Sequence, residues 1–323
     1  MNFKDGYKLI TILAFTMSGF FSFSQQNPFW SQHRGSLFLF NPSVAGSRKL
    51  LDARLGYRNQ WVGYEGAPKS IFFTLHGKLF DGKLGIGGIL LKDEIGPFRY
   101  FSTSGAVSYH IRFDDAKLSM GLGGGYQTQG YFSDKITTQF NQDPAVNYNL
   151  NEKVGNANLN AGILYYNDRF YIGLAASNLT SSKFEYYKAD TIRKALFSQV
   201  LHYNFAVGYN WQVDNSIIWE NSFMANYVAN SPLLLDYTLR LHFQEKLIAG
   251  LSLRLKSSVA FHLGYTFYNT YQISYSYDLS VNNLRTTNSG THELKLIFSS
   301  NLFQSDKKNR NREFQRQHFQ YLF

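Results

Sequence analysis

Apolar and polar residues alternate along most of the chain, and many of the apolar positions are aromatic. In residues 271–279 every second residue is apolar, and the residues between them are Gln, Ser and Asp. The same alternation runs through residues 157–165, 233–241 and 259–267. Successive side chains of a strand point to opposite faces, so this pattern predicts strands with one apolar and one polar face. A soluble β-sandwich also alternates, but a dozen or more such strands with aromatic apolar faces favour a transmembrane barrel wall.

The number of strands supports the same fold. A single-chain bacterial barrel has an even number of antiparallel strands, and the alternation predicts fourteen of them. They are expected at residues 50–60, 70–79, 83–92, 100–113, 117–127, 155–167, 169–179, 199–212, 216–228, 232–243, 246–255, 258–268, 270–281 and 291–299. The sequence thus predicts an all-β fold, a single antiparallel transmembrane β-barrel of about fourteen strands. Its polar faces are expected to line the lumen, because charge on the lipid face costs about 2–4 kcal/mol at mid-membrane.

The connections between these strands alternate in length. The odd-numbered connections include every long one, at residues 61–69, 93–99, 130–154, 180–198 and 282–290. The even-numbered connections are short, at residues 80–82, 114–116, 167–168, 213–215, 244–245 and 268–269. Bacterial barrels have short periplasmic turns and longer external loops. The long connections are therefore predicted to face the outside of the cell.

The first residues have the pattern of an export signal. Lys4 and Lys8 precede an apolar run at residues 9–23, and Ser22-Phe23-Ser24 matches a small-x-small cleavage site. This run is too short and too early to be a spanning helix. We expect residues 1–24 to be a signal peptide and the mature chain to begin at Gln25.

Two further segments flank the predicted barrel at residues 50–303. Residues 25–49 contain two Asn-Pro turns and the large side chains of Phe29, Trp30, Phe38 and Phe40. Such turns and apolar residues do not indicate a disordered leader, so we predict a plug in or under the barrel. Its deletion is expected to raise conductance. Residues 304–323 form a basic extension predicted to be periplasmic, whose last alternating residues are an alternative terminal strand.

Composition narrows the function classes. Aromatic residues make up 17% of the chain, as suits strands and the aromatic girdles of membrane barrels. The absence of cysteine excludes disulfides, thiolate metal sites and a lipidated N-terminal cysteine. The net charge of +10 is spread along the chain without a nucleic-acid recognition motif, so we expect no nucleic-acid partner and instead contact with membrane lipid.

Few residues suggest chemistry. His76, His110, His242 and His262 fall on predicted polar faces, where luminal hydrogen bonding explains them better than catalysis. Asp93-Glu94 is a weak cation site without a series of oxygen ligands. His292-Glu293 lacks the second histidine of a zinc helix. The sequence therefore predicts no enzyme, no catalytic residue, no metal site and no cofactor.

The glycine-rich run at residues 121–125 also has a simpler explanation than ligand binding. It lacks both the spacing of a phosphate-binding loop and the following Lys-Ser or Lys-Thr. Glycine in a barrel strand permits bending or close approach of another segment. We expect one of these two structural roles.

Several motifs resemble the PorP/SprF family of Bacteroidetes outer-membrane proteins, which work with the type IX secretion system. They are NPSVAGSR at residues 41–48, YRNQWVGYEGAPK at 57–69, the glycines of 85–88 with DEIGP at 93–97, and SGTHEL at 289–294. The resemblance implies a non-enzymatic barrel that helps to secrete, or to retain at the surface, a cargo protein with a type IX sorting domain. Other secretion or periplasmic components are implied partners, and some members are linked to gliding motility and adhesins.

A transporter is the main alternative, similar to the fourteen-stranded fatty-acid channels whose N-terminal segment plugs the barrel. For the secretion hypothesis, the long external loops are the expected partner-binding sites, because loops of that length are uncommon without function or disorder. The candidate residues are Trp61, Tyr64, Tyr131, Tyr148, Tyr186 and Tyr187. Trp61 has a second interpretation, as part of the outer aromatic girdle.

Overall fold

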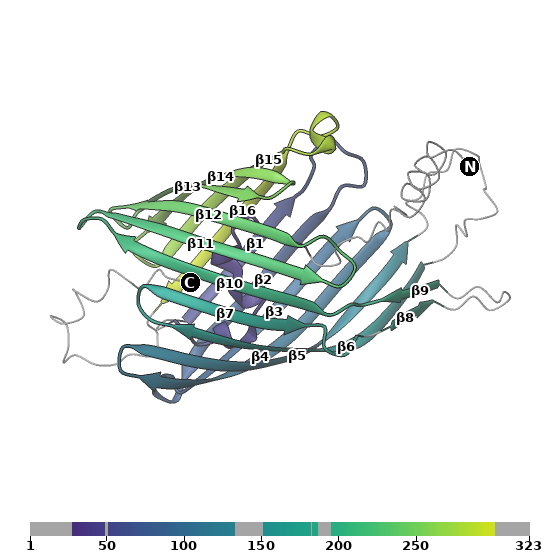
Figure 1. Cartoon of the computed structure of the whole chain (residues 1–323). Helices are drawn as coiled ribbons and strands as arrows, with labels where there is room; N and C mark the ends of the chain where they lie inside the picture. The colour runs from purple at the N-terminus through teal and green to yellow at the C-terminus, as the bar shows by residue number, and fades with distance from the viewer. Residues whose placement is uncertain (1–27, 49–50, 133–150, 182, 187–194, 301–323) are drawn as a thin grey trace, which may run out of the picture.

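The long strands close into one antiparallel barrel (Figure 1). The computed structural model describes residues 28–48, 51–132, 151–181, 183–186 and 195–300. Within these ranges the barrel strands are β1 (Leu51–Asn59), β2 (Lys69–Leu79), β3 (Leu84–Ile95), β4 (Phe98–Phe113), β5 (Ala116–Phe132), β6 (Asn151–Tyr166), β7 (Phe170–Ser177), β10 (His202–Gln212), β11 (Ile217–Val228), β12 (Leu234–Phe243), β13 (Leu247–Arg254), β14 (Ser258–Phe267), β15 (Tyr271–Ser280) and β16 (Thr291–Ser300). Consecutive barrel strands pair, and β1 pairs with β16 to close the ring. The predicted fourteen-stranded barrel is confirmed.

The two faces of the wall differ as the alternation predicts. On β14 the outward side chains of Phe261 and Leu263 are 48% and 60% exposed, whereas the inward His262 between them is 4% exposed. On β12, Asp236 and Arg240 are likewise buried on the luminal side. The apolar outer face suits lipid, and the polar groups of the inner face find partners inside the barrel. No helix among the described residues is long and apolar enough to cross a membrane.

Two predicted loops are wrong in their extent. Residues 93–99 are not a loop, because β3 and β4 continue to Ile95 and Phe98 and leave only a tight turn at Gly96-Pro97. Similarly, β5 and β6 extend into the predicted loop at 130–154, which leaves residues 133–150 outside the described part. On β3 the charged side chains of Lys92 and Glu94 stand on either side of the buried Asp93, so the apolar alternation that marks lipid contact is missing there.

The predicted loop at residues 180–198 also contains regular structure. Strands β8 (Lys183–Tyr186) and β9 (Ala195–Ser198) pair antiparallel as a separate two-stranded sheet. Figure 1 shows this sheet beyond the end of β7, at the rim that carries the longer connections. A run of four alternating residues is too short to distinguish a strand from a loop by pattern alone. We refer to this end of the barrel as the loop rim and to the other as the turn rim.

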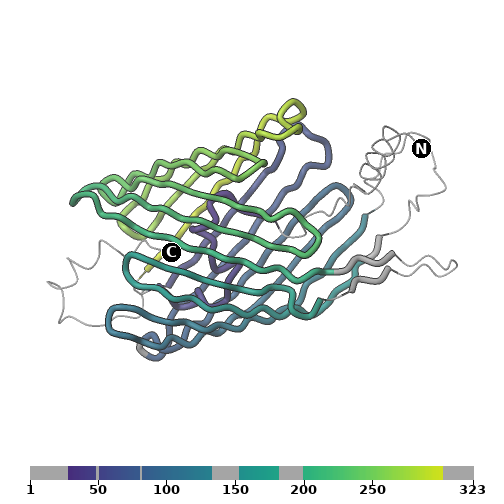
Figure 2. Tube along the Cα trace, viewed as in Figure 1, coloured from purple at the N-terminus to yellow at the C-terminus, as the bar shows by residue number. Residues whose placement is uncertain are grey.

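A segment before β1 lies inside the barrel, as the purple trace in Figure 2 shows. This inner segment, residues 28–48, contains the short 3₁₀ helices η1 (His33–Leu39) and η2 (Pro42–Val44). Trp30 packs edge-on against Phe72 of β2, with ring centroids 4.5 Å apart, toward the loop rim. Ala45 lies near the start of β3, at the turn rim. The inner segment therefore crosses the lumen from the loop rim to the turn rim before β1 begins.

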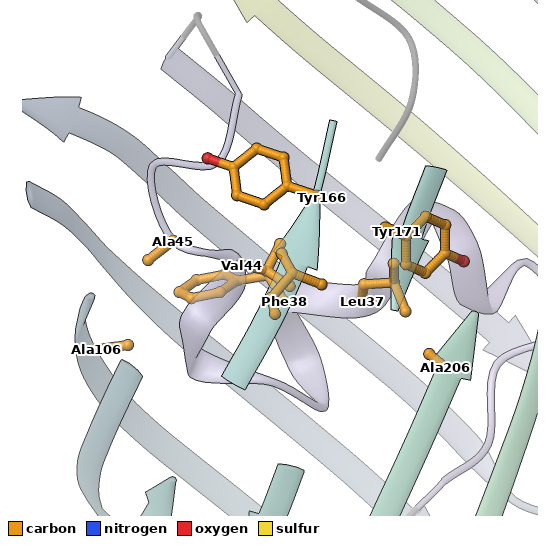
Figure 3. Close-up of a cluster of buried hydrophobic side chains, with 9 residues drawn as sticks. Leu37, Phe38, Val44, Ala45, Ala106, Tyr166, Tyr171 and Ala206 are labelled. Carbon is orange, nitrogen blue, oxygen red and sulfur yellow. The ribbon is translucent and has the colours of Figure 1, made fainter. Parts of the chain in front are cut away.

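The apolar core of the lumen lies between this segment and one side of the wall. Leu37, Phe38, Val44 and Ala45 of the inner segment meet wall residues from β4, β6, β7 and β10 (Figure 3). The wall residues of this cluster are Ala106, Leu164, Tyr166, Tyr171 and Ala206. Figure 3 shows the ring of Phe38 beside Val44 at the centre of the group. Burial of these side chains fixes one side of the inner segment to the wall.

Candidate functional site

The inner segment is held on its other side by buried ion pairs. Near the loop rim, Arg58 of β1 donates to Glu293 of β16 at 2.9 Å and to Asp278 of β15 at 3.0 Å. Glu293 also accepts the backbone N–H of Ser31 at 2.9 Å, and the Ser31 hydroxyl donates to Asp278. All four residues are buried. Three wall strands thus share one charge cluster with the beginning of the inner segment.

A second charge cluster lies further round the wall, on β11 and β12. The carboxylate of Glu220 on β11 accepts from Arg240 Nε at 2.6 Å and bonds His242 Nε2 at 2.7 Å. Arg34 of η1 lies 3.4 Å from the same carboxylate and donates to Asn210 at 2.7 Å. Burying such ions is favourable only with well-placed partners, and removal of one partner leaves an uncompensated buried charge. The cluster therefore specifies where η1 sits.

Further cations satisfy the carbonyl groups of η1. Lys295 of β16 donates to the carbonyl of Gln32 at 2.8 Å and to the hydroxyl of Ser36 at 2.6 Å. Arg54 of β1 donates to the carbonyl of Gly35 and is itself paired with Asp52. A short 3₁₀ helix leaves most of its carbonyls without internal partners. Here the wall supplies the missing donors.

Opposite these cations, η2 is seated directly on the barrel backbone. Ser119 donates to the carbonyl of Ser43 at 2.7 Å, and Ser108 donates to the carbonyl of Ala45 at 2.6 Å. A Cβ atom on Gly121 would lie 2.3 Å from the Ser43 nitrogen, and one on Gly85 would lie 2.1 Å from the Ala45 oxygen. Only glycine permits this approach of two backbones. For the glycine run at 121–125 we expected either bending of the strand or close approach of another segment. Gly121 permits close approach.

Asn41 fixes the entry to η2. Its side-chain amide donates to the carbonyl of Ile163 at 3.1 Å and of Leu174 at 3.4 Å, on β6 and β7. Its side-chain oxygen caps η2 by accepting the N–H of Ser43 at 3.0 Å. The motif at residues 41–48 therefore docks the second half of the inner segment on the wall.

The connection between β1 and β2, residues 60–68, forms a platform at the loop rim. Val62 exchanges backbone hydrogen bonds with the β15–β16 connection, donating to Gly290 at 2.8 Å and accepting from Ser289 at 2.7 Å. Gly66 accepts from the N–H of Gly96, in the β3–β4 turn, at 2.9 Å. Three connections far apart in sequence are thus joined by backbone hydrogen bonds, which limits the freedom of the platform.

The platform forms one side of an open pocket of about 620 Å³, lined in part by Trp61, Tyr64 and Glu94. Trp61 has a left-handed backbone with φ of 49°, a conformation uncommon outside glycine. Tyr64 is 52% exposed. The structure therefore brings together the two aromatic residues that the sequence proposed for this loop.

The other loop candidates are not assembled with this pair. Tyr131 lies at the end of β5, half-buried, with its ring 5.5 Å from that of Phe98. Tyr148 and Tyr187 lie outside the described residues, and Tyr186 is described only through its backbone in β8. Of the plug candidates, Trp30 and Phe38 are buried, and Phe29 and Phe40 are half-buried with ring centroids 6.0 Å apart.

The residues proposed for chemistry are occupied in structural contacts. Asp93 lies on β3 rather than in a loop and accepts from Ser70, while Glu94 pairs with Lys92 at 2.9 Å. His110 bonds the carbonyl of Ala45 at 2.9 Å, on the inner segment. His292 bonds the hydroxyl of Tyr275 at 2.6 Å on the outer face. In the described part of the chain no three His, Cys, Asp or Glu residues gather in a way that could hold a metal ion.

Sequence reasoning did not find the charge clusters. His242 is predicted to lie on a polar face, but its partner Glu220 and the inner-segment residue Arg34 are not singled out by any pattern. Opposite charges at the luminal positions of different strands indicate that ion pairs form in the lumen. They do not identify which residues pair. The pairing depends on strand register and on the path of the inner segment.

The fold and this site define a transmembrane β-barrel whose lumen holds a segment of its own chain. The sequence model of the family described as "Type IX secretion system membrane protein PorP/SprF" matches residues 22–298. The chain belongs to this family, as the motifs indicated, and it is an outer-membrane protein. No curated protein sequence matches it at a significant level.

Solved structures share the architecture at low sequence identity. The TodX deltaS2S3 mutant, titled a monoaromatic hydrocarbon channel, is 9% identical with a TM-score of 0.50, over 85% of this chain and 99% of that one. Omp33 of Acinetobacter baumannii is 8% identical with a TM-score of 0.46, over 77% and 98%. A Pseudomonas aeruginosa FadL homologue is 9% identical with a TM-score of 0.44, over 77% and 88%. The first of these likenesses supports the barrel fold alone.

Proposed function

We propose that this barrel is a non-enzymatic accessory of type IX secretion that assists secretion or surface anchoring of a cognate, adhesin-like secreted protein. The cargo meets the loop rim, where the platform of residues 60–68 presents Trp61 and Tyr64 around a pocket. The observation that carries the proposal is this pocket in a chain of the PorP/SprF family. Exposed aromatic residues next to a preformed pocket are common anchors of protein interfaces.

The inner segment supports this proposal over solute transport. Arg58 and Lys295, on the adjacent strands β1 and β16, each donate a hydrogen bond to the inner segment. Arg34 of the inner segment donates to Asn210 of the wall. A solute path along the axis requires these contacts to break. We therefore propose that residues 25–49 act as a plug and that the protein works through its rim.

The luminal histidines do not suggest an enzyme. His262 bonds the hydroxyl of Ser252 at 2.6 Å, which is the first contact of a nucleophile–base pair. Its other ring nitrogen has no partner among the described residues, so no group orients the base. Ser108, beside His110, is bonded to the inner segment instead. These contacts support a structural role for both pairs.

Trp61→Ala and Tyr64→Ala, combined in one variant, are expected to release the cargo from the cell surface. Loss of a buried or half-buried aromatic anchor typically weakens an interface by about 2 kcal/mol or more, or at least tenfold in affinity. The measurement is co-purification of secreted protein with the tagged barrel from solubilised outer membranes, together with the share of that protein in the medium.

Tyr268→Ala is the matched control for this experiment. Tyr268 is 92% exposed, but it lies in the β14–β15 turn at the opposite rim. The control is expected to retain the cargo as the unsubstituted protein does. Equal retention by the loop-rim variant and the control would count against the platform as the site of contact.

A further inference from the structure

A second recess lies above the inner segment, on the loop-rim side of the lumen. We refer to it as the vestibule. Phe29 and Phe40 of the inner segment form part of its lining, and β6, β10 and β11 contribute Asn160, Asn204 and Asn226. The recess is distinct from the platform pocket that Trp61 and Tyr64 line, because the two share no lining residue.

The vestibule differs from the rest of the lumen in charge. Its lining consists of amide, hydroxyl, imidazole, aromatic and aliphatic side chains, and none of the lining residues is Asp, Glu, Lys or Arg. The ion pairs described above are centred on other residues of the wall. The guanidinium of Arg254 lies 4.5 Å from the ring centroid of Phe29, but it is already paired with Asp236 at 3.2 Å. A ligand with a net charge would therefore leave water without gaining a free opposite charge, which is costly. The site therefore suits a neutral ligand.

The amides of the vestibule are pre-positioned by one another. Asn226 donates to the side-chain oxygen of Asn204 at 2.6 Å, across the β10–β11 ladder. Asn158 donates to the side-chain oxygen of Asn178 at 3.0 Å, and the backbone N–H of Asn178 donates to Asn160 at 3.1 Å. Each amide carries both donors and an acceptor, so these contacts leave part of the set for a ligand.

Two buried polar groups of the lining have no partner in the described part of the chain. Both ring nitrogens of His202 are unpaired although the residue is 2% exposed, and the side-chain oxygen of Asn158 is unpaired as well. A buried polar group without a hydrogen bond costs about 1–3 kcal/mol. A neutral imidazole has one donor nitrogen and one acceptor nitrogen on different edges of the ring, so it can bond two hydroxyl groups of a ligand.

We propose that the vestibule binds one uncharged sugar unit, such as the residue of a surface glycan. Sugar hydroxyls donate and accept like the amides and the imidazole that surround them, and the apolar edge of the ring can pack against Phe29 and Phe40. The vestibule holds about 80 Å³ of water-accessible space, room for roughly three waters at about 30 Å³ each. That space admits one edge of a sugar ring and excludes a folded domain.

Saturation-transfer NMR on the full-length protein in detergent tests this site. The neutral probes are the methyl glycosides of glucose, mannose, galactose and N-acetylglucosamine, and the charged probe is methyl glucuronide. We expect signal transfer to at least one neutral glycoside and none to the glucuronide. A neutral tripeptide, Asn-Gly-Ser, is the probe for a peptide ligand and is expected to show no transfer.

Asn204→Leu and His202→Leu are each expected to weaken glycoside binding at least tenfold. Tyr203→Phe is the control, because Tyr203 lies between His202 and Asn204 on β10 but points outward and is 50% exposed. All variants are first checked for the shift of a folded barrel on an unheated gel. If only one of the two test variants folds, that variant alone tests the proposal. Absence of transfer to every neutral glycoside, transfer to the peptide alone, or equal affinity in both test variants and the control would overturn the proposal.

Discussion

Gly121→Ala is expected to displace η2 from the wall and to open the lumen to ions. The added Cβ atom would lie 2.3 Å from the nitrogen and 2.5 Å from the Cα of Ser43. Both are backbone atoms, and the carbonyl of the same residue is held by Ser119 at 2.7 Å. Overpacking of this kind costs about 1–3 kcal/mol and often more where the neighbour cannot move. In planar bilayers, the single-channel conductance should rise several-fold above that of the unsubstituted protein.

Gly123→Ala is the control on the same strand and the same face. There the nearest atoms to an added Cβ are the Gly105 oxygen and the Pro42 Cβ, both at 3.5 Å, which is ordinary van der Waals contact. Its conductance should match that of the unsubstituted protein. Equal conductance of both glycine variants, in barrels of equal heat stability, would contradict the proposal that η2 closes the lumen.

Glu220→Ala is expected to cause the largest loss of stability among single substitutions in the charge clusters. It leaves Arg34 and Arg240 buried beside each other without their shared carboxylate. Breaking a buried pair in this way costs about 3–5 kcal/mol. The temperature at which the folded band disappears on a gel should fall by on the order of 10 °C.

Glu94→Ala provides the comparison for an ion pair at the rim. Glu94 pairs with Lys92 at 2.9 Å, and the two side chains are 32% and 54% exposed. Exposed pairs contribute about 0–1 kcal/mol, so the transition should move by no more than a few degrees. Similar shifts for the two variants would show that the luminal cluster does not hold the inner segment.

The strand order could be predicted from the sequence because lipid and lumen impose a period of two. The residues of β14 illustrate this, since Phe261, His262 and Leu263 point outward, inward and outward as the pattern requires. The same reasoning failed at Asp93, which continues β3 beyond the apolar alternation. A pattern that reports lipid contact carries little information where charged residues such as Lys92 and Glu94 take the outward positions of a strand.

The contents of the lumen were less predictable. The two Asn-Pro turns predicted a packed segment, but not that Asn41 binds the carbonyls of Ile163 and Leu174. Such a contact depends on backbone atoms, which have no signature in the sequence. Likewise, the glycine at 121 is explained only when Ser43 is seen against it. Trp61 and Tyr64 lie in one predicted loop, so the sequence could propose them together. The hydrogen bond from Val62 to Gly290, which joins this loop to the β15–β16 connection, has no such signal.

We propose that the loop rim retains one cognate secreted protein. The most direct test replaces residues 133–150 and 187–194, separately, with short Gly-Ser linkers, and compares cell-bound and released proteins by quantitative mass spectrometry. The strand ends Phe132 and Asn151 remain in place, so the barrel should keep its shift on an unheated gel. One secreted protein is expected to move from the cells to the medium in at least one replacement, as it does when the whole gene is deleted. If every secreted protein stays cell-bound in both replacements and in the combined Trp61→Ala and Tyr64→Ala variant, the loop rim does not retain a cargo.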